Sequence, residues 1–576
     1  MLSTLTRVLN PHRLVFSGAP LRPLSTTIPV MAKFSPITPE GFMAKPQNEP
    51  VLEYRAGSAE RTALDAALAK YAATVTRIPC IVGGEEFFTG REVVREMPFA
   101  REKVLAKFYE CDEELMKKAV ASCLEARTVW ERRPLKERAA VMLRAADLLA
   151  NKYRMDMNAV CMLGQGKTVV QAEIDAACET IDFLRFNSYF ALQLEQYTPI
   201  STDISTNRLR YRGLEGFVAA VSPFNFTAIG ANLASCPSLM GNVVLYKPSS
   251  TAILSNYLFY KIMEEAGLPA GVVNFVPCSG ALFGKILIQY KELAAINFTG
   301  SVPTFNYLWK KVAENLDQYE NYPRLIGECG GKNFHFVHPS ADLDTAAACT
   351  IRSAFEYQGQ KCSACARLYV PQSVWSTLKA KILAIRDEIK MGDPREPSSF
   401  MTACIDRKAY TRIKTYIEEG QKRPGVRLVA GGKCDDAVGY YVEPTIFEVD
   451  DPKDVLFTEE IFGPVLTVRV FADADVDAVL AGVKDDTPFG LTGAVFSKDL
   501  AFVAQAKETL KDAVGNLYIN DKSTGSVVGQ QPFGGARHSG TNDKAGSPHY
   551  VLRFASPQTV KETSVPMHDW KYPSMY

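Results

Sequence analysis

A glutamate and a cysteine, each set among glycines, are the residues of this chain best suited to do chemistry. Glu328 lies in Ile326-Gly-Glu-Cys-Gly-Gly-Lys-Asn333, and Cys362 lies in Tyr357-Gln-Gly-Gln-Lys-Cys-Ser363. Glycine lets the backbone turn sharply and lets a substrate come close. A thiol can attack a carbonyl to form a covalent intermediate, and a carboxylate can activate the water that hydrolyses it. Together the two segments predict oxidation of an aldehyde through a thioester.

Both residues also have less specific interpretations. Most cysteines in α/β enzymes are inert core residues, but the polar stretch before Cys362 is unlike core packing. Cys365 completes a Cys-x-x-Cys, which would indicate a thiol oxidoreductase if it opened a helix; here it precedes a predicted strand. Glu328 could be a solvated surface charge. The apolar residues before it and the glycines after it instead predict a partly buried carboxylate with a raised pKa.

Further candidates follow the ends of predicted strands, where ligands bind in open α/β sheets. Asn225, in Ser222-Pro-Phe-Asn-Phe-Thr227, can donate an amide N–H to an oxyanion, or it can cap a helix. Gly300, in Phe298-Thr-Gly-Ser301, precedes a helical pattern whose N-terminus would attract a pyrophosphate. Lys247 ends another strand and could bind a ribose or a phosphate. The usual Gly-x-Gly-x-x-Gly fingerprint is missing, so no one of these segments is specific by itself.

Two other motifs do not indicate sites. Gly164-Gln-Gly-Lys-Thr168 looks like half a phosphate-binding loop, but Cys161 replaces its first glycine and it follows a helix. His335 and His338 lie three apart in a predicted strand, where they face opposite sides, so we expect no metal site.

Alternating strands and helices must position these residues. From about residue 217, apolar runs alternate with helical stretches, which predicts a parallel α/β sheet with both faces covered. A second series begins after residue 324, and residues 113–160 have helical periodicity. The segment 196–216 is polar and strand-like, and the tail after Ser547 is extended; we expect these two pieces to pair between subunits. The predicted strands are 217–221, 243–247, 272–276, 294–298, 334–337, 368–370, 465–470 and 517–519.

Composition narrows the class of protein. The chain has 576 residues, is 47% hydrophobic, and has 65 Lys and Arg against 64 Asp and Glu. Because the net charge is close to zero and no long apolar run is present, we expect a small-molecule enzyme that neither binds nucleic acid nor inserts into a membrane. The 13 cysteines show no framework spacing, which fits a reducing compartment.

The first residues have the composition of a targeting segment. Residues 1–39 contain no Asp or Glu, but they have Arg7, Arg13, Arg22 and Lys33 among nine Ser and Thr. A disordered basic tail is the alternative. We predict a mitochondrial transit peptide over residues 1–36, cleaved between Arg22 and Pro36.

From about residue 80 to 560, the chain resembles the NAD(P)-dependent aldehyde dehydrogenase superfamily. Within it, the resemblance is greatest to the members that oxidise glutamate γ-semialdehyde in the mitochondrial matrix, the second step of proline degradation. Three segments carry it: Gly327–His338, Phe355–Cys365 and Ile519–Gly535. The resemblance implies an α/β fold of two Rossmann-type parallel-sheet domains plus a small β oligomerisation flap.

The resemblance also implies roles for individual residues. Cys362 would be the nucleophile, Glu328 the general base, and Asn225 the oxyanion donor. NAD would contact strand ends and a distant loop, namely Ser222, Lys247, Gly300, Ser301, Val302, Pro303, Thr304, Glu460 and Phe462. The substrate would contact Ser363, Gly525 and Ser526 through its amino and carboxylate groups, and Phe226 and Phe533 through its aliphatic chain. Ser250 stands where many NAD-preferring members have Glu, which leaves some use of NADP open.

The implied domains are an NAD-binding domain over 37–323, interrupted by an oligomerisation hairpin at 196–216, and a catalytic domain over 324–520. A substrate anchor loop that returns to the first domain follows at 521–546, and an oligomerisation tail at 547–576. We expect a homodimer with functional coupling to proline dehydrogenase. The alternatives are another semialdehyde dehydrogenase, a coenzyme A-acylating relative, which would typically lack the carboxylate of Glu328, and a non-catalytic protein on the same fold.

Overall fold

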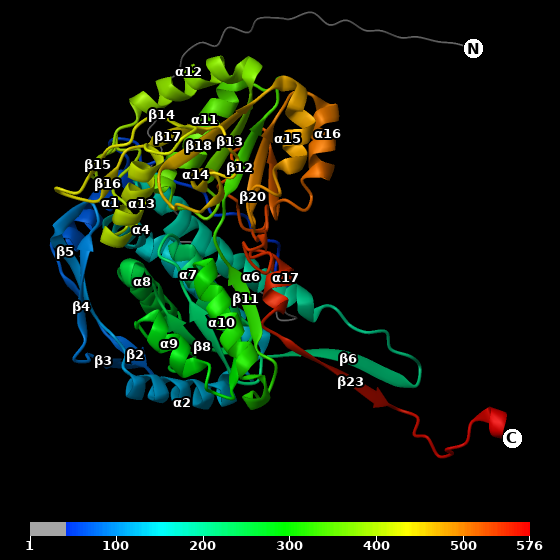
Figure 1. Cartoon of the computed structure of the whole chain (residues 1–576). Coiled ribbons are helices and arrows are strands. Elements are labelled where there is room, and N and C mark those ends of the chain that lie inside the picture. Colours follow the sequence, from blue (N-terminus) through cyan, green and yellow to red (C-terminus); the bar gives the residue numbers. More distant parts are fainter. Residues whose placement is uncertain (1–41) are drawn as a thin grey trace, which may run out of the picture. The chain divides into compact units, whose positions relative to one another are not determined.

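Two large β-sheets, each with helices on both faces, dominate the computed structural model, which describes residues 42–576 (Figure 1). The described residues belong to one compact unit. The transit peptide predicted for residues 1–36 lies outside them. No helix among residues 42–576 is long and apolar enough to cross a membrane.

The first sheet has the strand order β11-β10-β7-β8-β9-β2-β3. Its first five strands are parallel, and β2 and β3 add an antiparallel edge. Every residue of β8 and β10 is buried, as expected for strands covered on both faces. The strands are β7 (Phe217–Val221), β8 (Val243–Lys247), β9 (Val273–Phe275), β10 (Leu293–Thr299), β11 (Arg324–Glu328), β2 (Cys80–Val82) and β3 (Glu85–Phe87).

A helix follows each of the parallel strands β7 to β10, so all four strands end at the same edge of the sheet. This edge therefore collects the residues that come directly after the strands. The crossover helices are α7 (Thr227–Leu239), α8 (Ile253–Glu265), α9 (Gly280–Leu287) and α10 (Val302–Glu314).

The second sheet has the order β14-β17-β18-β13-β12-β20-β21 and is parallel except for β14. Its strands are β12 (Asn333–Val337), β13 (Cys365–Pro371), β14 (Val426–Ala430), β17 (Thr445–Val449), β18 (Val465–Phe471), β20 (Thr492–Phe496) and β21 (Asn516–Ile519). Its helices are α11 (Leu343–Phe355), α12 (Gln372–Glu388), α13 (Arg407–Gly420), α14 (Val455–Thr458), α15 (Val476–Gly482) and α16 (Leu500–Thr509).

A helical layer and small sheets complete the fold. The layer contains α1 (Ala59–Ala72), α3 (Leu135–Leu148), α4 (Arg154–Gln165), α5 (Val169–Ala172) and α6 (Thr180–Glu195), with a π-helical turn η2 (Glu173–Glu179) before α6. Helix α2 (Glu113–Trp130) instead packs on the first sheet beside α9. The small sheets join β1 (Thr76–Ile78), β5 (Ala100–Tyr109) and β4 (Glu92–Met97); β15 (Cys434–Asp435) and β16 (Tyr441–Val442); and β19 (Phe489–Gly490) and β22 (Ala536–Arg537). Helix α17 (Pro548–Leu552) precedes the last strand.

The expected boundary at residue 324 is too early. Strand β11 pairs in parallel with β10, from Ala295↔Arg324 to Thr299↔Glu328, so it closes the edge of the first sheet. The second sheet starts at Asn333. Both series consist of similar apolar strands, so a strand's hydrophobicity does not say which sheet it joins.

The expected hairpin within 196–216 is also wrong. This segment contains a single strand, β6 (Ser205–Arg212), which pairs antiparallel with β23 (Ser556–Thr563) over eight residue pairs of the same chain. Figure 1 shows this ribbon projecting from both sheets. The polar, strand-like character of 196–216 and the extended tail indicated the two pieces, but we expected them to pair between subunits, whereas they pair within one chain.

Candidate functional site

Cys362 lies in a tightly held loop between a short 3-10 turn, η5 (Glu356–Gly359), and strand β13. Tyr357 and Gln358 in that turn have φ of 51° and 56°, a left-handed conformation that costs about 1–3 kcal/mol per non-glycine residue. The Gln358 side chain offsets this cost. It donates to the Ala403 carbonyl over 2.8 Å and accepts from the Thr402 N–H over 3.1 Å.

The loop is fastened on both sides of the thiol. Asn225 Nδ2 donates to the Gln360 carbonyl over 3.0 Å, which brings the predicted oxyanion donor to the nucleophile loop. Asn333 Nδ2 donates to the carbonyl of Cys362 itself over 2.6 Å. A Cβ at Gly331 would lie 2.3 Å from that carbonyl oxygen, so only glycine fits there.

Glu328 ends strand β11, and its neighbours disfavour its charge. The Oε2 atom is buried and has no hydrogen-bond partner among the described residues. Burial, with the Asp543 carboxylate nearby, raises the pKa of Glu328 well above its usual range; the Gly535 N–H and Lys544 oppose this only in part. The prediction of a desolvated carboxylate with a raised pKa agrees with this environment.

Glu328 and Cys362 line the same cavity, of about 130 Å³. All five predicted substrate residues line it as well: Phe226, Ser363, Gly525, Ser526 and Phe533. The aromatic rings supply apolar walls, and the loop at Gly525 supplies hydroxyl and backbone groups. Gly525 has φ of 86°, which favours glycine. Sequence-distant segments therefore meet around one thiol.

Burial also raises the pKa of the Cys362 thiol, and the carboxylates of Glu328 and Glu460 add to the effect. The backbone N–H groups of Cys362 and Ser363 lower it only in part. These effects favour the protonated thiol, so a nucleophilic Cys362 must lose its proton before it attacks.

The predicted cofactor residues lie along one edge of the first sheet. Ser222 follows β7, Lys247 ends β8, and Gly300 follows β10. The Ser249 N–H donates to Ser222 Oγ over 3.1 Å, and the Gly300 N–H donates to the Glu328 carbonyl over 3.1 Å. This edge therefore continues directly into the strand that carries the predicted base.

Helix α10 begins at this edge with Val302, Pro303 and Thr304. Ser301 precedes the helix, and its Oγ lies 2.9 Å from Thr304 Oγ1. A helix N-terminus favours an anion, because its first N–H groups lack partners within the helix. The adjacent Lys247 is buried, and its Nζ bonds only a backbone carbonyl, that of Pro248, among the described residues. A cation of this kind and a free helix N-terminus fit the phosphates and ribose of a dinucleotide.

Glu460 and Phe462 line a second hollow, which shares Lys361 with the first. Glu460 Oε1 accepts from the Gly331 N–H over 2.7 Å, and burial raises the pKa of Glu460 to about 7. Phe462 has φ of 56° and stacks edge-to-face on Phe224 at 5.7 Å between ring centroids. Both predicted residues therefore lie beside the nucleophile loop, in a hollow next to the substrate cavity.

Other cavity residues were missed by the sequence reasoning. Glu179 and Phe183, from η2 and α6, form one wall, and Asn297, Lys522 and Tyr550 lie elsewhere in the lining. Burial raises the pKa of Glu179 to about 8. No motif surrounds Glu179 or Phe183, and only the packing of the helical layer against the sheet brings these two residues to the thiol. Lys522, by contrast, lies within the segment Ile519–Gly535.

Comparison with known proteins was made for the sequence and for the fold. The Aldehyde dehydrogenase family matches residues 89–560. The mitochondrial delta-1-pyrroline-5-carboxylate dehydrogenase of Homo sapiens is 54% identical over 532 residues, which cover 92% of this chain and 94% of that protein.

Solved structures agree with the sequence match. The delta-pyrroline-5-carboxylate dehydrogenase of Mycobacterium tuberculosis bound with NAD superposes with a TM-score of 0.90 at 43% identity, covering 94% of this chain and all of that one (100%). Proline utilization A (PutA) of Bdellovibrio bacteriovorus superposes with a TM-score of 0.85 at 30% identity, covering 92% of this chain but 54% of that longer chain.

Proposed function

This chain belongs to the aldehyde dehydrogenase family, and we propose that it is an NAD-dependent L-glutamate γ-semialdehyde dehydrogenase. Its substrate forms from Δ1-pyrroline-5-carboxylate by ring opening, and its product is L-glutamate, in the second step of proline degradation. The observation that carries this proposal is the single cavity in which Cys362, Glu328 and the loop at Ser526 meet. Relatives and solved structures with this activity support it.

Cys362 is the nucleophile in this proposal. Its thiolate attacks the aldehyde carbon, a C–S bond forms, and the carbonyl oxygen becomes an oxyanion. Asn225 Nδ2 has a second N–H besides the one donated to Gln360, and with the Cys362 backbone N–H it stabilises that oxyanion. NAD, when bound, would supply the oxidant that removes a hydride from this carbon as its C=O bond re-forms to give the thioester.

Glu328 then completes the cycle as the general base. Its carboxylate takes a proton from a water molecule, the water attacks the Cys362 thioester, and the C–S bond breaks to release glutamate and the thiol. Ser222, Lys247 and residues Gly300 to Thr304 hold the dinucleotide, and Glu460 and Phe462 hold its nicotinamide riboside.

The five cavity residues named above give the substrate preference. Phe226 and Phe533 contact the methylene chain, and Ser363, Gly525 and Ser526 bind the α-amino and α-carboxylate groups. A semialdehyde that bears both groups therefore gains contacts that a simple aldehyde lacks.

Assembly and location extend the proposal. We infer a homodimer built through the β6–β23 ribbon, whose flanking residues Ile200, Ile204 and Val565 are exposed apolar side chains. The protein acts in mitochondria, as its named mammalian relatives do, and we assign it to the matrix. The match to 54% of a chain named for proline utilization supports functional coupling to proline dehydrogenase.

NADH production tests the proposal directly. Steady-state rates are compared for pyrroline-5-carboxylate, succinate semialdehyde and propanal, with NAD and with NADP. We expect pyrroline-5-carboxylate with NAD to give the highest kcat/KM and the Cys362→Ser variant to give none. Equal kcat/KM for the three aldehydes would refute the assigned substrate.

A further inference from the structure

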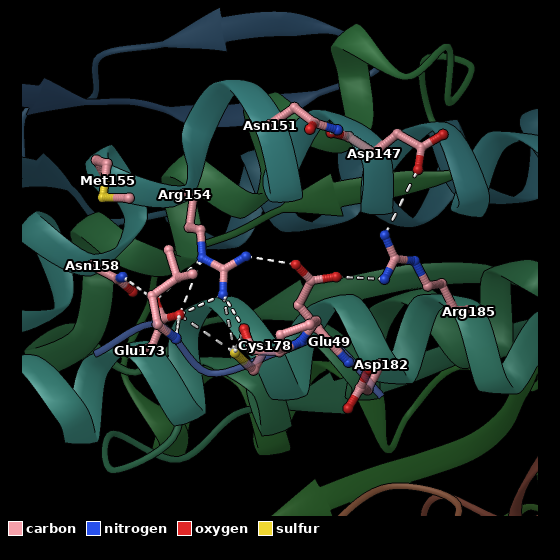
Figure 2. Close-up of polar contacts among 12 residues, drawn as sticks. Glu49, Asp147, Asn151, Arg154, Met155, Asn158, Glu173, Cys178, Asp182 and Arg185 are labelled. Carbon is pink, nitrogen blue, oxygen red and sulfur yellow. Dashed lines mark hydrogen bonds and ion pairs between the residues drawn. The ribbon is translucent and has the colours of Figure 1, made fainter. Parts of the chain in front are cut away.

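A segment near the start of the described residues, which we call the N-terminal arm (Asn48–Tyr54), is bonded to the helical layer through buried charges. Glu49 accepts from Arg154 Nη1 and from Arg185 Nη1, each over 2.5 Å (Figure 2). Arg154 also donates to the Pro50 carbonyl over 2.6 Å. The arm therefore supplies two hydrogen-bond acceptors, a carboxylate and a carbonyl, to Arg154 of helix α4.

A second carboxylate fixes the other end of the arm. Glu173, on η2, pairs with Arg154 and accepts from the Leu52 N–H over 3.0 Å and the Tyr54 hydroxyl over 2.6 Å. Asn158 also donates to it, over 2.6 Å. The charges of Arg154, Glu49 and Glu173 are largely buried and paired with one another, so the arm has one well-defined position.

Asn48 extends this arm to the substrate cavity. Its Nδ2 donates to Asp182 Oδ2 over 2.8 Å and to the Val528 carbonyl over 2.8 Å. Its Oδ1 accepts from Gln530 Nε2 over 2.8 Å. One amide thus uses both ends to connect helix α6 with the residues that follow Ser526.

The two segments that Asn48 connects both belong to parts of the chain that line the substrate cavity. Helix α6, which carries Asp182, also supplies Phe183 to the cavity wall, and Val528 is two residues beyond Ser526. Between Val527 and Gln531 the loop forms a turn, with Gln530 and Gln531 N–H groups both donating to the Val527 carbonyl over 3.0 Å. Because this turn links Val527 to Gln531, the bonds of Asn48 to Val528 and Gln530 help to position the whole loop.

We propose that Asn48 is a positioning residue for substrate recognition: by bonding both Asp182 and the Val528 carbonyl, it holds the Gly525–Ser526 loop at the distance from helix α6 that the α-amino and α-carboxylate groups require. The proposal rests on the proposed function, because it concerns the same loop. It adds that the specificity of the cavity depends on a residue outside its lining.

The loop has other supports, so losing Asn48 loosens it and does not unfold it. Val528 is buried in the core, and Gly529, with φ of 78°, packs against Phe186, where a Cβ would lie 2.4 Å from the ring. These contacts hold the loop's backbone against α6 but form no polar bond to it. Apolar packing is non-directional, so it lets the loop shift along the helix. The hydrogen bonds of Asn48 fix the position of the loop because they depend on distance and angle.

The first test compares Asn48→Ala with Tyr54→Phe. Tyr54→Phe is the matched control, since it removes hydrogen bonds of the same arm to Glu173 and Asn158 and none to the loop. We expect Asn48→Ala to raise the KM for pyrroline-5-carboxylate about tenfold, the equivalent of one or two hydrogen bonds, with kcat and the kcat/KM for propanal unchanged. Tyr54→Phe should lower the melting temperature without changing KM.

An exchange of the two side chains separates the bond to the loop from the bond to the helix. In the double variant N48D/D182N, the amide introduced at position 182 can donate to the carboxylate introduced at position 48, so the arm–helix bond returns with its roles reversed. That carboxylate still cannot donate to the Val528 carbonyl. We expect the melting temperature to recover relative to N48D and the KM for pyrroline-5-carboxylate to stay high.

The outcomes are distinct for the two proposals. If wild-type enzyme shows no preference for pyrroline-5-carboxylate over propanal, the proposed function fails. If wild type has that preference and N48A keeps it, or if N48D/D182N restores the KM, the positioning role of Asn48 is refuted. A KM change of equal size in Tyr54→Phe would also refute it, because general loosening of the arm would then suffice.

Discussion

Replacing Glu328 with glutamine separates the two halves of the proposed cycle. Glutamine keeps the size of the side chain and can still accept from the Gly535 N–H through its oxygen, so the cavity keeps its shape. It cannot take a proton from water. Attack by Cys362 and oxidation of the substrate should therefore proceed, while hydrolysis of the thioester should stall.

The size of the effect follows from the environment of Glu328. A positioned general base contributes about 10²–10⁴-fold, equivalent to about 3–5 kcal/mol in the barrier. Burial and the nearby Asp543 raise the pKa of Glu328, which makes its carboxylate a stronger base than an exposed glutamate. We therefore expect the steady-state rate of Glu328→Gln to fall by a factor in the upper part of that range, about 10³–10⁴.

Rapid-mixing measurement of NADH absorbance checks this prediction. We expect a burst of one NADH per active site, followed by a slow steady rate. Cys362→Ser is the control without a burst, and Cys365→Ser, a buried residue that begins β13, is the control that should behave as wild type. A linear trace at the wild-type rate would remove Glu328 from the role of base. Loss of the burst itself would show that acylation also needs this carboxylate.

The same variant carries a pH signature in both rate and stability. Because the folded-state pKa of Glu328 is raised, the base form increases as pH rises through that value, so wild-type deacylation should accelerate as pH rises through the raised pKa and the glutamine variant should not. The contribution of Glu328 to the stability of the wild-type protein instead decreases as pH rises. The stabilising contribution of the protonated form is fully present below the unfolded pKa of about 4.3 and is lost as pH rises through the folded pKa. The melting temperature of Glu328→Gln relative to wild type should therefore increase with pH.

Three further predictions concern other groups of residues. Asn225→Ala should lower kcat about 10²–10³-fold by removing an oxyanion donor, with NAD binding by fluorescence unchanged; an unaltered kcat would exclude that role. Ser526→Ala should raise the KM for pyrroline-5-carboxylate about tenfold and leave that for propanal as it is, and equal changes for both would contradict an α-carboxylate contact. Glu173→Gln should destabilise the fold by about 3–5 kcal/mol in thermal or denaturant unfolding, because it leaves the Arg154 charge buried with one carboxylate fewer; a loss under about 1 kcal/mol would show that Glu49 alone satisfies that arginine.

Much of the fold was predictable where a strand's burial shows in its sequence. The predicted strands 217–221 and 243–247 have the bounds of β7 and β8, since a strand covered on both faces is an uninterrupted apolar run. Strand β20 lies inside the second sheet but was not predicted. Its sequence Thr-Gly-Ala-Val-Phe has few large apolar residues, and its glycine is needed because a Cβ at Gly493 would lie 2.4 Å from the Phe334 ring.

The candidate site was predictable where the chemistry of a side chain shows in its local context. Glycines beside Glu328 and Cys362 marked the two groups, and both line one cavity. Glu179 and Asn48 have no such context. The first reaches the cavity because the helical layer packs against the sheet, and the second acts through a backbone carbonyl that no sequence pattern records. Contacts of this kind depend on tertiary packing and not on local sequence.

The burial that raises the pKa of Glu328 also raises the pKa of the Cys362 thiol, and both shifts bear on the proposed cycle. Each group's negative charge raises the energy of the other, so the cavity favours a single negative charge shared between them. The thiolate therefore forms more easily while Glu328 is neutral, and the uncharged glutamine of Glu328→Gln leaves this step possible, in keeping with the expected burst. Once the thioester has formed, the sulfur no longer carries charge, and Glu328 can lose its proton and take the basic form that hydrolysis requires. In the proposed cycle the two residues therefore hold negative charge in turn.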